Sequence, residues 1–317
     1  MTECNFSKLV FQVHQNRKLR IPTDVPADFD YLENVWLSFY GLGKFEFYSF
    51  LYSECKDFEH FKEWVIKLKG TQFVHAADQQ FKKWEATRNN LDINGGIVPK
   101  VLNADQMKFW EQNGYLVVPK VVDDLKCDKV RQKICRYLNI HLDFPATWYM
   151  SHPDWQGIMV QLYQNEDMEA IRQDLEIRKI FADLYNSDQI IPNTEKVGYN
   201  PPEVEGWEFK HGELHWDLDL SKTVQFGVQA LVYLDDVPVE RGALQVVPGF
   251  NNKFEDWIKD FTSLERAHTY MRLTETSVPV PGEKGDLILW RNTIPHAAGK
   301  NQSNLPRFVQ YVSFTKV

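Results

Sequence analysis

The sequence lacks the long apolar runs and paired cysteines that mark membrane proteins and secreted, disulfide-rich proteins. It has no stretch of about 18 apolar residues, and residues 1–10 do not have the pattern of a signal peptide. The four cysteines, Cys4, Cys55, Cys127 and Cys135, are scattered without CxxC spacing, which argues against a disulfide framework and against a cysteine zinc site. We therefore expect a soluble, cytoplasmic protein with reduced thiols and no membrane partner.

An excess of positive charge is also missing. The 317 residues include 36 Lys and Arg against 44 Asp and Glu, a net charge of −8. Nucleic-acid binding requires a basic surface that neutralises phosphates, so we expect no nucleic-acid partner. Hydrophobic residues make up 43% and charged residues 25% of the chain, which is ordinary for globular proteins and argues against intrinsic disorder.

Residues 1–96 are predicted to form a helical N-terminal extension. Apolar side chains recur at helical spacing over residues 57–69, and Gly70 follows as a C-terminal cap. Helix is favoured over strand for the aromatic-rich residues 31–55, and residues 78–88 predict another helix. Asn and Gly residues over 89–96 indicate a linker. The aromatic faces are expected to be buried, either as a lid packed on the rest of the chain or at a dimer interface, so monomer and homodimer both stay open.

Residues 97–317 are predicted to form a mainly β domain with flanking helices. Asn103 and Gln106 have the spacing of a capping box, Gly114 ends that helix, and residues 115–118 form a short apolar strand. Another helix is expected over residues 123–137. Strand-like segments then follow between turn residues, at 158–163, 196–199, 224–234, 243–247, 286–290 and 308–314. Such a series of short strands indicates an all-β sandwich or barrel with helices packed outside it.

The most informative motif lies in residues 210–219. Side chains two residues apart on a strand point the same way, so His215 and Asp217 are predicted to face one site. Two histidines and one carboxylate form the ligand set of non-haem iron(II) oxygenases. His296, 81 residues farther on after a predicted strand, is the candidate for the second histidine, and Arg307 follows eleven residues later at the head of the last predicted strand.

Together these features resemble the phytanoyl-CoA dioxygenase superfamily of iron(II)- and 2-oxoglutarate-dependent oxygenases. The family's H-x-D…H arrangement matches His215, Asp217 and His296, and its 2-oxoglutarate arginine matches Arg307. The resemblance covers about residues 98–317 and implies a double-stranded β-helix, a jelly-roll or cupin-like core.

The framing segments agree with this resemblance. Residues 102–118 are similar to the family's opening helix and strand, and residues 231–248 to its central hairpin. Phe250-Asn251 stands where the family often has Ser-His, so a substrate contact at that position does not carry over.

The resemblance implies a mechanism. The three ligands would hold iron(II), 2-oxoglutarate would chelate the metal through its keto-acid end, and dioxygen would take the remaining position. Arg307 would clamp the far carboxylate, because its planar fork makes a bidentate pair that lysine cannot. Gln161 and Gln229, on strands expected to line the pocket, are further candidates for cofactor binding. The expected reaction oxidises a small-molecule substrate with release of succinate and carbon dioxide; hydroxylation is the default, and desaturation or ring closure stays open.

Other functions also stay open. His211, His215 and His296 could hold zinc in a hydrolase whose nucleophile is metal-bound water, although His211 and Asp219 are more simply interpreted as neighbours of the metal ligands. The fold could also serve as a non-catalytic binding module. Metal identity and dependence on 2-oxoglutarate distinguish these functions.

Overall fold

The computed structural model describes residues 5–88, 100–209, 212–219 and 223–317. The chain forms two compact units, Met1–Val98 with Tyr185–Glu195 and Phe314–Val317, and Pro99–Leu184 with Lys196–Ser313. Cys55, Cys127 and Cys135 are free thiols, and Cys4 lies outside the described residues. No helix in the described ranges combines the length and the apolar character needed to cross a membrane.

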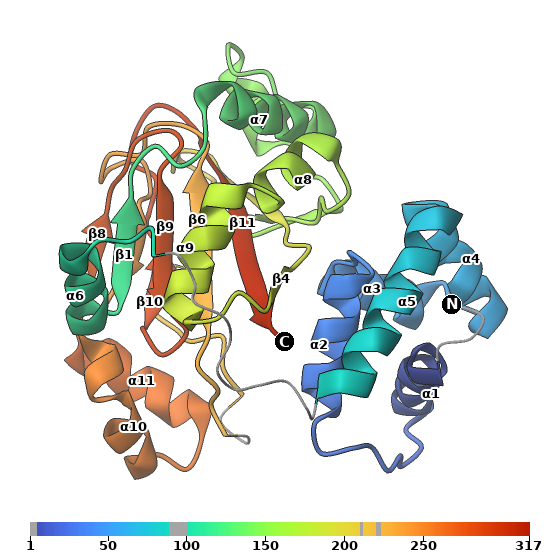
Figure 1. Cartoon of the computed structure of the whole chain (residues 1–317). Coiled ribbons are helices and arrows are strands. Elements are labelled where there is room, and N and C mark those ends of the chain that lie inside the picture. Colours follow the sequence, from blue (N-terminus) through green and yellow to red (C-terminus); the bar gives the residue numbers. More distant parts are fainter. Residues whose placement is uncertain (1–4, 89–99, 210–211, 220–222) are drawn as a thin grey trace. The chain divides into compact units, whose positions relative to one another are not determined.

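The first unit contains helices α1 (Asn5–Leu19), α2 (Phe29–Phe39), α3 (Lys44–Ser53), α4 (Phe58–Lys69) and α5 (Thr71–Thr87) (Figure 1). Their aromatic side chains form its core, in which Trp36, Phe47 and Phe61 are fully buried. The helix predicted over residues 57–69 is confirmed. Asp57 caps α4, and Gly70, at φ 84°, ends α4 and starts α5, so the helix expected from residue 78 begins seven residues earlier.

A strand pair belongs to the same unit. β4 (Ile190–Pro192) pairs antiparallel with the end of β11 (Arg307–Lys316), where Phe314 lies opposite Pro192. The Ser38 hydroxyl of α2 donates a hydrogen bond to Asn193 Oδ1 at 2.7 Å. These segments lie far from the helices in sequence, and no sequence pattern connects them to the helices.

The second unit is a double-stranded β-helix, or jelly roll. Its larger sheet has the strand order β1-β9-β6-β11-β5-β3-β2, and its smaller sheet the order β10-β7-β8. Figure 1 shows β1, β9, β6 and β11 of the larger sheet side by side. Apolar side chains of both sheets, among them Tyr233, Val246, Trp290 and Val309, pack into one buried cluster, so the core lies between the sheets. The strands are β1 (Tyr115–Val118), β2 (Trp155–Gln156), β3 (Met159–Val160), β5 (Val197–Asn200), β6 (Val228–Tyr233), β7 (Leu244–Val246), β8 (Val278–Val280), β9 (Leu287–Arg291) and β10 (His296–Ala298).

The capped helix and the strand predicted near the start of this unit are confirmed. Asn103 and Gln106 form the capping box of α6 (Ala104–Asn113), Gly114 ends the helix in the left-handed conformation, and β1 spans the predicted residues. α7 (Asp124–Leu138) begins after its cap, Asp123.

Two strand predictions differ from the structure. Of the strand predicted over residues 158–163, only the two residues of β3 are paired as a strand. The described residues of 210–219 form a single isolated bridge, at His215. Four helices were not predicted: α8 (Glu166–Arg172), α9 (Leu175–Tyr185), α10 (Phe254–Trp257) and α11 (Leu264–Thr274).

Candidate metal centre

The backbones of His215 and His296 form a reciprocal pair. Each N–H donates to the other residue's carbonyl, at 3.0 Å in both directions. Residues that exchange both hydrogen bonds across an antiparallel bridge present their side chains on one face, and the two imidazole centroids lie 4.6 Å apart. The bridge thus joins histidines 81 residues apart in sequence.

Asp217 completes the group of donor atoms. Its Oδ1 lies 3.8 Å from His215 Nε2, and its Oδ2 lies 3.5 Å from His296 Nε2. One ligand atom from each residue lies within 4.8 Å of the others, and no further such group occurs in the ranges that the structure describes. The side chains of His215, Asp217 and His296, which the sequence predicts to share one site, therefore lie close together in the structure.

Backbone carbonyls set the tautomer of both histidines. Nδ1 of His215 lies 2.9 Å from the Glu213 carbonyl, and Nδ1 of His296 lies 3.2 Å from the Ile294 carbonyl. Because a carbonyl can only accept, Nδ1 carries the proton and Nε2 keeps its lone pair toward Asp217. Burial, followed by the neighbouring His296, lowers the pKa of His215, which favours the neutral form that binds metals.

Asp217 is held as an anion. The Asp217 side chain is 59% exposed; its partial desolvation favours the protonated form, but the adjacent His296 imidazole and the Gln229 amide lower the pKa of Asp217 below its usual value. Gln229 Nε2 donates to Asp217 Oδ2 at 2.8 Å, and its Oε1 accepts from Trp290 Nε1 at 3.0 Å. Two imidazole nitrogens and one carboxylate oxygen fit a non-haem iron(II) site.

Helix α11 supports the segment that carries the candidate ligands His215 and Asp217. Trp216, between them, points into the apolar core, and its backbone N–H donates to His268 Nε2 at 3.1 Å. Arg272 Nε donates to the Leu214 carbonyl at 2.8 Å. These contacts replace the strand pairing that the segment lacks, and no sequence pattern predicted them.

Arg307 is buried in the second unit, with only 1% of its surface exposed. On β11 it alternates with Val309 and Tyr311, which face the cluster that also contains Trp290, and the Trp290 ring lies 5.1 Å from that of His296. Its Nη1 donates to the Gly242 carbonyl. Its Nε and Nη2 have no hydrogen-bond partner among the described residues.

These two nitrogens form one edge of the guanidinium group, the edge that binds a carboxylate through two parallel hydrogen bonds. A buried cation with this edge unpaired fits an anionic ligand, and 2-oxoglutarate has the required carboxylate.

The other predicted residues have separate outcomes. Gln229 contacts the candidate ligand Asp217, as described above. The side chain of Gln161 accepts a hydrogen bond from the Tyr163 hydroxyl, and no contact with the three candidate ligands is found for it in the described residues. Asp219 is not part of the convergent donor group. His211 lies outside the described residues.

Comparison with known proteins agrees with the resemblance. The sequence profile of the phytanoyl-CoA dioxygenase (PhyH) family matches residues 110–309. Peroxisomal phytanoyl-CoA dioxygenase of Bos taurus is 25% identical over 226 residues, 64% of this chain and 65% of the relative, so the match spans just under two thirds of the relative's length. A putative phytanoyl-CoA dioxygenase of Dictyostelium discoideum is 18% identical over 65% of this chain and 73% of its own.

Solved structures share the fold at low sequence identity. The carbocyclase SnoK of nogalamycin biosynthesis, described as non-haem and α-ketoglutarate dependent, has a TM-score of 0.52 and 18% identity over 68% of this chain and 85% of its own. The epimerase SnoN, in complex with Fe3+, α-ketoglutarate and nogalamycin RO, has a TM-score of 0.50 and 20% identity over 67% and 82%.

Proposed function

This chain belongs to the phytanoyl-CoA dioxygenase family, and we propose that it is an iron(II)- and 2-oxoglutarate-dependent oxygenase that hydroxylates a small-molecule metabolite. The observation that carries the proposal is the convergence of His215, Asp217 and His296 with both Nε2 atoms available to a metal. The unpaired edge of buried Arg307 supports the second half of the proposal, the use of 2-oxoglutarate.

The chain's own groups have distinct tasks in this reaction. His215, Asp217 and His296 would hold iron(II), which when bound supplies dioxygen activation coupled to the conversion of 2-oxoglutarate to succinate and carbon dioxide. Arg307 binds the distal carboxylate of 2-oxoglutarate and thereby orients its keto-acid end. Gln229 keeps the carboxylate of Asp217 in position.

The substrate is proposed to be a small polar or amphipathic metabolite. The sequence has no cluster of Lys and Arg that would announce a site for the phosphates of coenzyme A, and its net charge of −8 disfavours polyanionic partners. We propose a cytoplasmic protein, monomeric or homodimeric, in which residues 97–317 are the oxygenase domain and residues 1–96 the helical extension.

Anaerobic titration of the metal-free protein with iron(II) and 2-oxoglutarate tests the cofactor pair. We expect the weak visible metal-to-ligand charge-transfer band of a chelated keto acid. Asp217→Ala should lose the band, because one of three ligands is gone. His141→Ala is the matched control and should keep it, because the hydrogen bonds of exposed His141 that the structure describes use its backbone.

The other outcomes separate the alternatives. A band of full intensity in Asp217→Ala would contradict the ligand assignment. Tight zinc binding without a band would favour the hydrolase, and absence of metal binding would favour a non-catalytic module. Once the band is established, consumption of 2-oxoglutarate with candidate metabolites identifies the substrate.

A further inference from the structure

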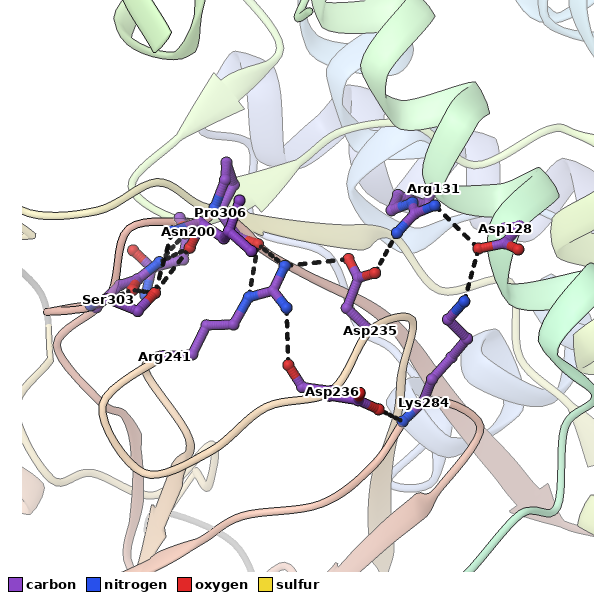
Figure 2. A network of polar contacts seen from close by, with 11 residues as sticks. Asp128, Arg131, Asn200, Asp235, Asp236, Arg241, Lys284, Ser303 and Pro306 are labelled. Atoms are coloured by element: carbon purple, nitrogen blue, oxygen red, sulfur yellow. Dashed lines mark hydrogen bonds and ion pairs between the residues drawn. The ribbon is translucent and has the colours of Figure 1, made fainter. Parts of the chain in front are cut away.

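Arg241 lies in one loop and Arg307 directly follows a second, neighbouring loop, and each binds the backbone beside the other. Arg241 donates from Nε and Nη2 to the Pro306 carbonyl, at 3.0 and 2.6 Å, and Pro306 immediately precedes Arg307. Arg307 in turn donates from Nη1 to the carbonyl of Gly242, which immediately follows Arg241. Each arginine therefore holds the backbone next to the other, and Figure 2 shows the Arg241 half of this arrangement.

The backbones of the two loops are also joined. Arg241 and Asn301 form an isolated antiparallel bridge, and the Gln302 N–H donates to the Glu240 carbonyl at 2.7 Å. Gly242 has φ 74°, and a Cβ at this position would lie 2.9 Å from the Gly299 carbonyl oxygen. The turn that presents the Gly242 carbonyl to Arg307 therefore requires glycine.

A charged network fixes Arg241 from its other side (Figure 2). Its Nη1 donates to the Asp236 carbonyl at 2.8 Å, and its Nη2 lies 3.4 Å from Asp235 Oδ2. Asp235 also pairs with Arg131 on α7, which pairs with Asp128 at 3.0 Å. The Arg241 side chain is 12% exposed, so these contacts are largely shielded from water.

We propose that Arg241 is a positioning residue for 2-oxoglutarate: by fixing the Pro306 carbonyl, it aims the unpaired edge of Arg307 at the distal carboxylate of the co-substrate. This inference rests on the proposed function. The planar guanidinium group is needed because Nε and Nη2 of Arg241 both donate to the Pro306 carbonyl while Nη1 donates to the Asp236 carbonyl. A lysine keeps the charge but has a single nitrogen and cannot make this set of bonds.

The test compares two keto acids of equal length. 2-Oxoglutarate and 2-oxovalerate share the keto-acid end, but 2-oxovalerate ends in a methyl group in place of the distal carboxylate. Calorimetric titration of the full chain, loaded with nickel(II) so that no turnover occurs, measures Kd for both. Because the bidentate pair is misaligned rather than removed, Arg241→Lys should raise Kd for 2-oxoglutarate about tenfold and leave Kd for 2-oxovalerate within about twofold.

Arg131→Lys is the matched control. Arg131 belongs to the same network through Asp235 but makes no described contact with Pro306, so its variant should keep both affinities. Equal weakening for the two keto acids, or equal loss of 2-oxoglutarate affinity in Arg131→Lys, would overturn the positioning role, because either result points to general loosening of the network.

Hydrogen exchange of the wild-type protein gives an independent readout should Arg241→Lys fold poorly. 2-Oxoglutarate should slow amide exchange over residues 236–243 more than saturating 2-oxovalerate does, and equal protection would overturn the inference. A wild-type protein that binds 2-oxoglutarate no better than 2-oxovalerate would overturn the proposed role of Arg307 and this inference with it. A preference for 2-oxoglutarate that is undiminished in Arg241→Lys would overturn this inference alone.

Discussion

Replacing Arg307 by methionine is expected to stabilise the protein in the absence of 2-oxoglutarate and to remove its response to that ligand. Each buried, unpaired polar group is worth roughly 1–3 kcal/mol of destabilisation, so Nε and Nη2 of Arg307 together destabilise by about 4 kcal/mol. Methionine removes this penalty with a flexible apolar side chain. It also loses the bond from Nη1 to the Gly242 carbonyl, about 2 kcal/mol. The net change is a stabilisation of about 2 kcal/mol, within the range for apolar replacement of buried ions.

Thermal unfolding with and without ligand measures both parts of this prediction. An unfolding entropy of about 2.1 cal/mol/K per residue over 317 residues converts 2 kcal/mol into a rise in Tm of about 3 °C. A 2-oxoglutarate concentration of 100 times Kd should stabilise the wild type by about 2.7 kcal/mol, or about 4 °C on the same scale. Arg307→Met should show no such shift.

Arg172 provides the matched control. Its side chain is 2% exposed, but Nη1 pairs with Glu169 at 3.0 Å and Nη2 donates to the Tyr163 carbonyl at 2.7 Å. Glu169 is 44% exposed, so its pair with Arg172 adds little, and Arg172→Met should destabilise the protein by about 2 kcal/mol through the lost bond to the Tyr163 carbonyl, the opposite sign to Arg307→Met. A ligand-free Arg307→Met variant that melts below the wild type would refute the reasoning, because it would mean that the fold itself uses the guanidinium group.

Two further variants test the support of the site. Gln229→Leu removes the 2.8 Å hydrogen bond to Asp217 and should weaken zinc binding roughly 10- to 100-fold, measured by competition with a chromophoric chelator; unchanged affinity would exclude this orienting role. Gly242→Ala places a Cβ 2.8 Å from Asn200 Nδ2 at φ 74° and should destabilise by about 3 kcal/mol in urea unfolding, whereas Gly206→Ala, at φ 86° with open space around it, should lose only about 1 kcal/mol. Equal losses would rule out the steric explanation.

Capping residues in the sequence predicted the helices whose ends they form. Asp57 and Gly70 bound α4, and Asn103 and Gly114 bound α6, because caps act on backbone groups within a few residues. The H-x-D spacing predicted that His215 and Asp217 share a face, although the extended strand expected around them is a single bridge.

Contacts between distant segments left no comparable signal. The segment of the candidate ligands His215 and Asp217 is held by His268 and Arg272 of α11, which lie 52 and 58 residues in sequence from the backbone groups they bind. Arg241 was visible only as part of a hairpin motif. Its role depends on where the loop ending at Pro306 lies in space, and no periodicity encodes that position. For the same reason β4 could not be assigned to the helical unit.

The carbonyl acceptors behind the two histidines affect how the site tolerates mutation. Glu213 and Ile294 supply main-chain oxygens, so substitution at either position changes a side chain and leaves the acceptor of the imidazole proton in place. Mutation of these two residues therefore does not change which imidazole nitrogen carries the proton. Asp217, in contrast, depends on the side-chain amide of Gln229, which one point mutation can remove. Point mutations of the residues around the candidate metal centre should therefore disturb the orientation of its carboxylate more readily than the protonation of its imidazoles.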